Sequence, residues 1–148
     1  MAASPGRSQL TSKACLFCQI VSGEVKSNIV FSDDVSLAFL DQRPLFPGHC
    51  LLIPREHVDT LGELPSDLVP SFFRNAQRIA SAIERVMEAE GTFLAINNKV
   101  SQSVPHLHLH IVPRKKGDGL KGFFWPRQKY QSEEQMAEVA AKLRTCLE

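Results

Sequence analysis

The chain has 148 residues, enough for one domain with a buried core, and its 43% hydrophobic and 22% charged residues are ordinary for a globular protein. Seventeen basic and sixteen acidic side chains leave a formal net charge of +1, which argues against binding nucleic acid or membranes through bulk charge. No apolar run is long enough to cross a bilayer, and residues 1–13, which lack the apolar core of a signal peptide, are expected to form a disordered tail.

The first feature after this tail is the pair Cys15 and Cys18. Alone, the spacing fits half of a zinc site, a redox pair or coincidence. The remaining cysteines, Cys50 and Cys146, have no interpretable spacing, and a disulfide scaffold would be shorter and richer in cysteine. A reducing, cytoplasmic location is therefore expected.

Three short strands are predicted next, over residues 28–32, 36–41 and 49–53. The turn-forming Asp33-Asp34 separates the first two strands, which indicates a hairpin. Pro54 is expected to stop the third strand, because proline cannot donate to the ladder.

The clearest helix is predicted over residues 66–90, where apolar residues recur at helical spacing along one stripe. Ser66 is positioned to cap its start and Gly91 its end, and Pro70 is tolerated because it falls in the first turn. A stripe of this kind predicts packing against the protein core.

Two more strands are predicted over residues 92–97 and 106–112, separated by a polar loop. From Pro113 to Tyr130 the chain turns irregular and basic. A final helix is predicted from the capping box of Ser132 and Gln135 and from a second apolar stripe formed by Met136, Val139, Ala140, Leu143 and Leu147.

This order of elements predicts an α+β domain over residues 14–148. Short connections between neighbouring strands favour an antiparallel sheet of about five strands with two main helices packed on it.

Three of the five histidines, His106, His108 and His110, alternate with apolar residues in the strand predicted over 106–112. Side chains alternate across a strand, so the three imidazoles are expected on one face, at Cα spacings of roughly 6.5 Å. A merely solvated face would seldom concentrate histidine in this way. Two functional alternatives remain: a catalytic zinc bound by the histidines, or a structural zinc at His106 beside a nucleophilic His108.

Several motifs together resemble the histidine triad (HIT) superfamily. The signature stands as HLHLHIV after QSVP, and CLFCQIVSGEV, VFSDDVSLAFLD, PGHCLLIPREH and IVPRKKGDG are similar to their counterparts, in order and at suitable spacing. The resemblance covers residues 14 to about 125 and is nearest to bacterial HIT hydrolases with an N-terminal Cys-x-x-Cys. SEEQMAEVAAKL also resembles the C-terminal helix of the Fhit branch.

The resemblance implies a nucleotide hydrolase or transferase, active on adenosine phosphoramidates or dinucleoside polyphosphates and assembled as a homodimer. In such enzymes the middle histidine, here His108, attacks the α-phosphorus and a nucleotidyl-histidine forms. His110, Gln102 and Ser103 would bind the phosphate, with Ser103 or His110 near the leaving group. His49 would support the triad.

The same resemblance assigns the rest of the nucleotide site. Asp41 would hold the ribose hydroxyls, and Asn97, or Asn98 under a shifted alignment, would contact ribose or phosphate. The apolar base pocket would consist of Leu16, Phe17, Ile20, Phe39 and Leu40.

A zinc site is implied as well. Relatives with Cys-x-x-Cys hold zinc at positions that match Cys15, Cys18, His57 and His106 in this chain. Four protein ligands close the coordination shell, so this zinc would be structural rather than catalytic.

Two regions depart from the family pattern. Residues 98–101 contain no glycine, whereas many relatives have a glycine-rich phosphate loop there. The basic segment from Arg114 to Lys129, with Phe123, Phe124 and Trp125, is either a solvated loop or an element that steers polyphosphate or completes a partner's site.

Two other functions stay open at this level. A zinc-water hydrolase would use triad histidines as metal ligands, and a non-enzymatic interaction module would bind nucleotide without turning it over.

Overall fold

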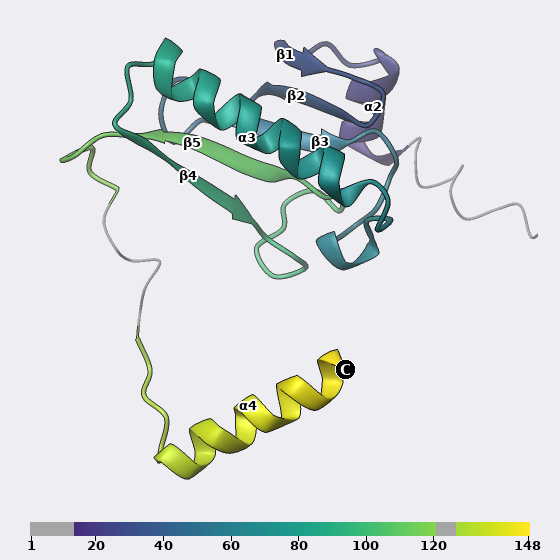
Figure 1. Cartoon of the computed structure of the whole chain (residues 1–148). Helices are drawn as coiled ribbons and strands as arrows, with labels where there is room; N and C mark the ends of the chain where they lie inside the picture. The colour runs from purple at the N-terminus through teal and green to yellow at the C-terminus, as the bar shows by residue number, and fades with distance from the viewer. Residues whose placement is uncertain (1–13, 121–126) are drawn as a thin grey trace, which may run out of the picture. The chain divides into compact units, whose positions relative to one another are not determined.

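The computed structural model describes residues 14–120 and 127–148 (Figure 1). The chain divides into two units, one ending at Lys116 and one beginning at Gly117, and each is considered by itself. The predicted tail over 1–13 and the aromatic residues Phe123, Phe124 and Trp125 lie outside the described residues.

Five antiparallel strands form one sheet in the first unit, in the order β1-β2-β3-β5-β4. Their bounds are Ile29–Ser32 (β1), Ser36–Leu40 (β2), Cys50–Pro54 (β3), Gly91–Ile96 (β4) and Leu109–Arg114 (β5). The predicted α+β class and antiparallel sheet are thus confirmed. Pro54 is the last residue of β3, where it pairs with Ser36.

Helix α3 (Val69–Val86) lies across one face of the sheet (Figure 1). Its apolar stripe is buried against residues that alternate along β3 and β5, including Leu52, Leu109 and Ile111. The opposite face carries a second cluster, in which Phe17 and Ile20 pack on side chains from β2 and β3. The sheet therefore separates a helix-covered core from the face on which the histidines lie.

The ends of α3 differ from the prediction. Pro70 has no N–H to donate to the Ser66 carbonyl, so the first bond at this end runs from Phe72 N–H to Leu68 O. Ser66 is accordingly left in a turn outside the helix and does not cap it. At the other end the helix stops at Val86, and Gly91 begins β4 instead.

Two short helical elements were not predicted. Helix α2 (Leu16–Ser22) begins after Cys15, whose Sγ accepts a bond from Cys18 N–H, and ends at Gly23 in a left-handed conformation with φ of 82°. A 3-10 turn covers Leu61–Glu63. Glycine after a short apolar run was the available signal for the end of α2.

Strand β5 also begins later than predicted. Only His110 of the three histidines lies within it, whereas His106 and His108 precede its first residue. The pairing of β3 with β5 ends at Leu52 and Leu109, and the Pro54 carbonyl beyond this point accepts a bond from the His106 side chain instead. A hydrogen bond from the His106 side chain thus replaces the backbone pairing of the two strands at this point. Leu107 is still buried in the core.

The second unit contains α4 (Glu133–Leu147). Ser132 caps it by accepting from Gln135 N–H, as predicted, and the Gln135 side chain accepts from Gln131 N–H. Packing of this helix on the sheet, and hence a single domain over 14–148, stays a prediction. Among the described helices, none is both long and apolar enough to span a membrane.

Candidate active site and metal centre

His108 is held in one tautomer by the backbone two residues earlier. Its Nδ1 lies 2.7 Å from the carbonyl oxygen of His106. Because a carbonyl only accepts, Nδ1 carries the proton and Nε2 keeps its lone pair. The ring is 3% exposed and meets the edge of Phe17 at a centroid distance of 5.1 Å. This imidazole is prepared to act as a nucleophile or an acceptor through Nε2.

His110 is oriented by a chain of hydrogen bonds through His49. The Leu45 N–H donates to His49 Nδ1 over 3.1 Å, so the proton of neutral His49 lies on Nε2. That Nε2 is 3.0 Å from His110 Nδ1 and donates to it. The remaining proton of His110 therefore lies on its Nε2, which becomes a donor.

The imidazoles of His49 and His110 are kept neutral by their surroundings. Burial, with the neighbouring His108 and His49, lowers the pKa of His110 to about 4. Burial likewise lowers the pKa of His49, against an opposing effect of Asp41. A neutral pair preserves the direction of the hydrogen bonds near neutral pH.

A cavity of about 340 Å³ opens beside His108 and His110. All five apolar residues predicted to form the base pocket line it, together with Asp41 and Ser103. Sequence reasoning missed six further lining residues, three of which (Val25, Leu51 and Val104) stand in quoted motifs that could have drawn attention to them: Val25, Ser27, Gln42, Arg43, Leu51 and Val104. The volume is within the range of about 300–1,000 Å³ typical of small-molecule sites.

Asp41 lies just beyond β2, at the edge of this cavity. Its Oδ1 accepts the Arg43 N–H over 2.8 Å, and its Oδ2 is 3.7 Å from His49 Nε2. The carboxylate thus retains acceptor capacity for a ligand while it faces the histidine chain.

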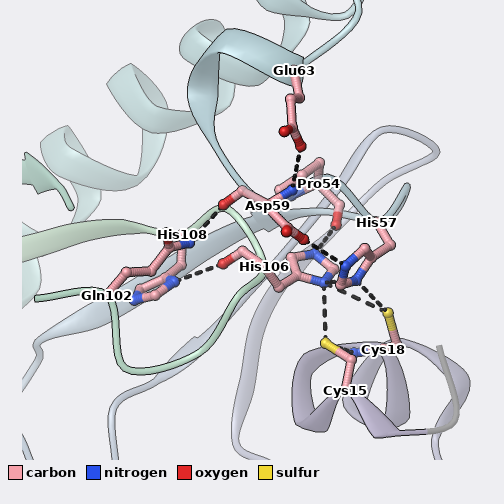
Figure 2. Close-up of polar contacts among 9 residues, drawn as sticks. All are labelled: Cys15, Cys18, Pro54, His57, Asp59, Glu63, Gln102, His106 and His108. Atoms are coloured by element: carbon pink, nitrogen blue, oxygen red, sulfur yellow. Dashed lines mark hydrogen bonds and ion pairs between the residues drawn. The ribbon is translucent and has the colours of Figure 1, made fainter. Parts of the chain in front are cut away.

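Two residues predicted for nucleotide binding do not line the cavity. Asn97 follows the end of β4, and Gln102 is directed to other protein groups (Figure 2). Gln102 donates from Nε2 to the Asp59 carbonyl over 2.6 Å, and its Oε1 accepts the Lys99 N–H over 2.8 Å. Asn98, the alternative to Asn97, accepts the Leu61 N–H through Oδ1.

The four predicted metal ligands converge in one cluster (Figure 2). His106 Nδ1 is 3.5 Å from Cys15 Sγ and 3.6 Å from Cys18 Sγ. His57 Nδ1 is 3.2 Å from Cys18 Sγ and 3.1 Å from His106 Nδ1. Bonds of about 2.0 Å to nitrogen and 2.3 Å to sulfur in a tetrahedron put neighbouring ligand atoms about 3.3 to 3.8 Å apart, close to these distances.

The tautomers of the two cluster histidines also suit a cation. His106 Nε2 donates to the Pro54 carbonyl over 2.9 Å, and His57 Nε2 is 3.0 Å from Asp59 Oδ1. Both Nδ1 lone pairs therefore point at each other and at the sulfur atoms. Facing lone pairs repel, and zinc coordination would remove that repulsion.

The protonation states of His106 and Cys18 are compatible with binding a metal ion. Burial lowers the pKa of His106 to about 4, so the ring is a neutral ligand. Burial, with the hydrogen bond and charge of Cys15, raises the pKa of Cys18 to about 12. A thiol of this kind gives up its proton when a metal ion replaces it. The donor set fits zinc.

Comparison with known proteins shows the family to which the chain is similar. A model of the HIT domain matches residues 22–117. Protein hit of Bacillus subtilis is 40% identical over 114 residues, which cover 75% of this chain and 78% of that protein. Adenylylsulfatase HINT3 of Arabidopsis thaliana is 37% identical over 108 residues, covering 72% of this chain and 55% of that protein. The solved structure of a Zn-bound histidine triad family protein from Mycobacterium smegmatis has a TM-score of 0.70 at 35% identity and covers 91% of this chain and 99% of its own.

Proposed function

The chain belongs to the HIT-domain family, and from this premise we propose that it is a nucleotide hydrolase or transferase that cleaves at the α-phosphate. The observation that carries the proposal is the fixed tautomer of His108, whose Nε2 lone pair is free while Nδ1 is bonded to the His106 carbonyl. The adenylylsulfatase activity named for the Arabidopsis thaliana relative supports chemistry at a nucleotide α-phosphate.

The reaction begins when His108 Nε2 attacks the α-phosphorus of an adenosine phosphoramidate or a dinucleoside polyphosphate. The new N–P bond forms as the bond from phosphorus to the leaving group breaks, and the leaving group takes the electron pair. The imidazole becomes positively charged, and the His106 carbonyl stabilises it through the Nδ1 proton. Water, or another acceptor, then displaces His108 and releases the nucleotide.

His110 and Ser103 supply hydrogen-bond donors to the reacting phosphate. The His110 Nε2 proton is fixed by His49, so it is available to a phosphate oxygen without reorganisation. Ser103 lines the same cavity and, with His110, is the donor that can protonate the leaving group. The apolar residues from α2 and β2 would enclose the base, and the Asp41 carboxylate would accept from the ribose hydroxyls.

Zinc would be held by Cys15, Cys18, His57 and His106, as its donor set and the Zn-bound relative suggest. A zinc ion held by these four residues would stabilise the fold and would leave no open position for water, because four protein ligands fill its coordination shell. His108 and His110 contribute no atom to this cluster. That division favours a histidine nucleophile over a zinc-water mechanism.

The proposal is tested by intact-protein mass spectrometry after rapid mixing with an adenosine phosphoramidate. An adduct of one nucleotide mass is expected on the wild type and not on His108→Ala, with turnover reduced by roughly 10³-fold or more. Cys146→Ser, in α4, serves as the control and should retain the adduct. If His108→Ala turns over substrate as fast as the wild type, His108 is not the nucleophile.

A further inference from the structure

We propose that Asp59 and Gln102 couple the metal centre to the loop over residues 98–103, so that metal binding orders the loop that carries Ser103. The loop's role in holding phosphate rests on the proposed function, whereas the coupling itself does not. Figure 2 shows the connection as a continuous series from the cysteines through His57 and Asp59 to Gln102.

The side chain of Asp59 fixes the metal-facing nitrogen of His57. Its Oδ1 lies 3.0 Å from His57 Nε2, which leaves Nδ1 to the cluster. A carboxylate that accepts from a ligating histidine holds its ring orientation and raises its basicity. The Asp59 side chain is 54% exposed, so its ion pair alone would contribute little to stability. Its function is better explained by orientation than by stabilisation of the fold.

The backbone of Asp59 holds the loop over residues 98–103. The Asp59 carbonyl accepts the Gln102 amide over 2.6 Å, and the Asp59 N–H donates to Glu63 Oε2 over 3.0 Å. A second bridge runs from Leu61 N–H to Asn98 Oδ1 over 3.0 Å. The segment after His57 is therefore joined to both ends of the loop.

The loop depends on these bridges because its own backbone is unfavourable. Lys99 and Ser101 have φ of 68° and 60°, a left-handed conformation that costs non-glycine residues free energy. Gln102 bonds Lys99 N–H with one end of its amide and Asp59 with the other. This one side chain thus holds a strained turn against the segment that provides a metal ligand.

Metal binding acts on this chain of contacts through His57. Without a cation, the His57 and His106 Nδ1 atoms face each other across 3.1 Å. We expect the His57 ring to turn away from this repulsion. Such a movement would release Asp59 Oδ1 and loosen the segment that anchors Gln102. Coupling between two sites is reciprocal, so loss of the Gln102 bridge must weaken metal binding in turn.

The first test is hydrogen exchange of the Lys99 amide in the zinc-loaded protein and after chelation. We expect exchange about fivefold or more slower with zinc, within the usual range of coupling between sites. Gln102→Met removes both amide bonds and should reduce this difference to less than about twofold. Gln77→Met, the same change on the exposed face of α3, should leave it unchanged. The buried Leu52 amide of β3 reports on global unfolding. A Lys99 amide that exchanges equally with and without zinc, while Leu52 stays protected, overturns the proposal.

The second measurement is zinc affinity, by competition with a chromophoric chelator, and it decides the matter even if chelation unfolds the protein. Asp59→Ala should weaken zinc binding roughly 10- to 100-fold, and Gln102→Met should weaken it about fivefold, although neither residue is a ligand. Affinity of Gln102→Met equal to that of Gln77→Met overturns the coupling. Neither measurement uses a nucleotide, so their failure is distinct from failure of the nucleotidyl-His108 adduct to form.

Discussion

The Nε2 atom of His49 lies 3.0 Å from the Nδ1 atom of His110, and the opposite nitrogen of His49 accepts the Leu45 N–H. This arrangement sets which nitrogen of His110 carries its proton, although His49 and His110 belong to different segments of the chain. His49 is therefore a positioning residue in the proposed reaction.

Replacing His49 with alanine is expected to lower kcat roughly 10- to 100-fold, because His110 can then adopt either tautomer. His49→Gln should recover part of this loss, since its amide can still donate to His110 Nδ1. Steady-state kinetics with an adenosine phosphoramidate measure both variants. Equal kcat for His49→Ala and the wild type would contradict the positioning role.

The stability of the protein should fall as the pH decreases from about 6.5 to about 4. The pKa of His110 is lowered from 6.5 to about 4, so within this window the unfolded chain binds a proton that the folded protein does not. Its stabilising effect is complete above the unfolded pKa and is lost on acidification. The lowered pKa of His49 acts in the same direction, and His108 and Asp41 are the neighbouring titratable groups.

Urea unfolding of the wild type and of His110→Gln across this pH window provides the measurement. The free energy of unfolding should fall less steeply in the variant, because glutamine does not titrate. Parallel pH profiles would show that His110 is not responsible.

Removal of zinc should destabilise the protein and reduce turnover without abolishing it. A ligand at about 100 times its Kd stabilises the folded state by about 2.7 kcal/mol, and chelation removes that contribution. Differential scanning fluorimetry, turnover and the amount of the His108 adduct are measured with and without chelator. Complete loss of turnover in protein that circular dichroism shows to be folded, with no adduct on the zinc-loaded protein, would favour a zinc-water mechanism.

Asn75 links α3 to the turn between β1 and β2, and its loss should destabilise the fold. Its amide donates to Asp33 Oδ2 and to Ser36 Oγ, each over 2.7 Å, at a position that is 3% exposed. Asn75→Ala is expected to cost about 2 to 3 kcal/mol in the free energy of unfolding, measured with urea. Gln77→Ala, at an exposed position of the same helix, should change it by less than about 0.5 kcal/mol.

The hydrogen bonds among Asn75, Asp33 and Ser36 should also make the free energy of unfolding sensitive to acid. Although burial raises it, the pKa of Asp33 is lowered overall by hydrogen bonds from Ser36, Asn75 and Val35. A carboxylate with a lowered pKa stabilises the fold above its unfolded pKa, and this effect is lost as the pH falls through the folded pKa. Asn75→Ala should therefore flatten the acid limb of the stability curve. If the acid limb of the stability curve is the same in Asn75→Ala and the wild type, groups other than Asp33 cause the loss of stability in acid.

The homodimer implied by the family resemblance stays a prediction, and β4 offers a place to test it. This strand is at one edge of the sheet, and Leu94 on it is 41% exposed. We expect a dimer to form through this edge. Sedimentation velocity should then give a dimer for the wild type and a smaller species for Leu94→Arg, because association would bury the introduced charge. A monomeric wild type would contradict the resemblance on this point.

The sequence by itself determined the sheet and its two faces, and it singled out the histidines and cysteines that the structure brings together. Periodicity sufficed for β1 to β5 and α3, since alternation and helical stripes are local properties. The resemblance supplied the four metal-cluster residues and five apolar residues of the pocket, but it could not say how the hydrogen bonds at the site run.

Only the tertiary structure decided which ring nitrogen of the site histidines carries the proton. Pro54 lies far from His106 in sequence, and its carbonyl selects the tautomer of that ring. Leu45 and Asp59 lie near His49 and His57 in sequence, but only the folded chain turns their polar atoms toward those rings. The ends of β5 and α3 were also decided there, because a side chain took the Pro54 carbonyl and Pro70 lacked a donor. Hydrogen-bond partners across long sequence separations are set by packing, and local patterns do not contain them.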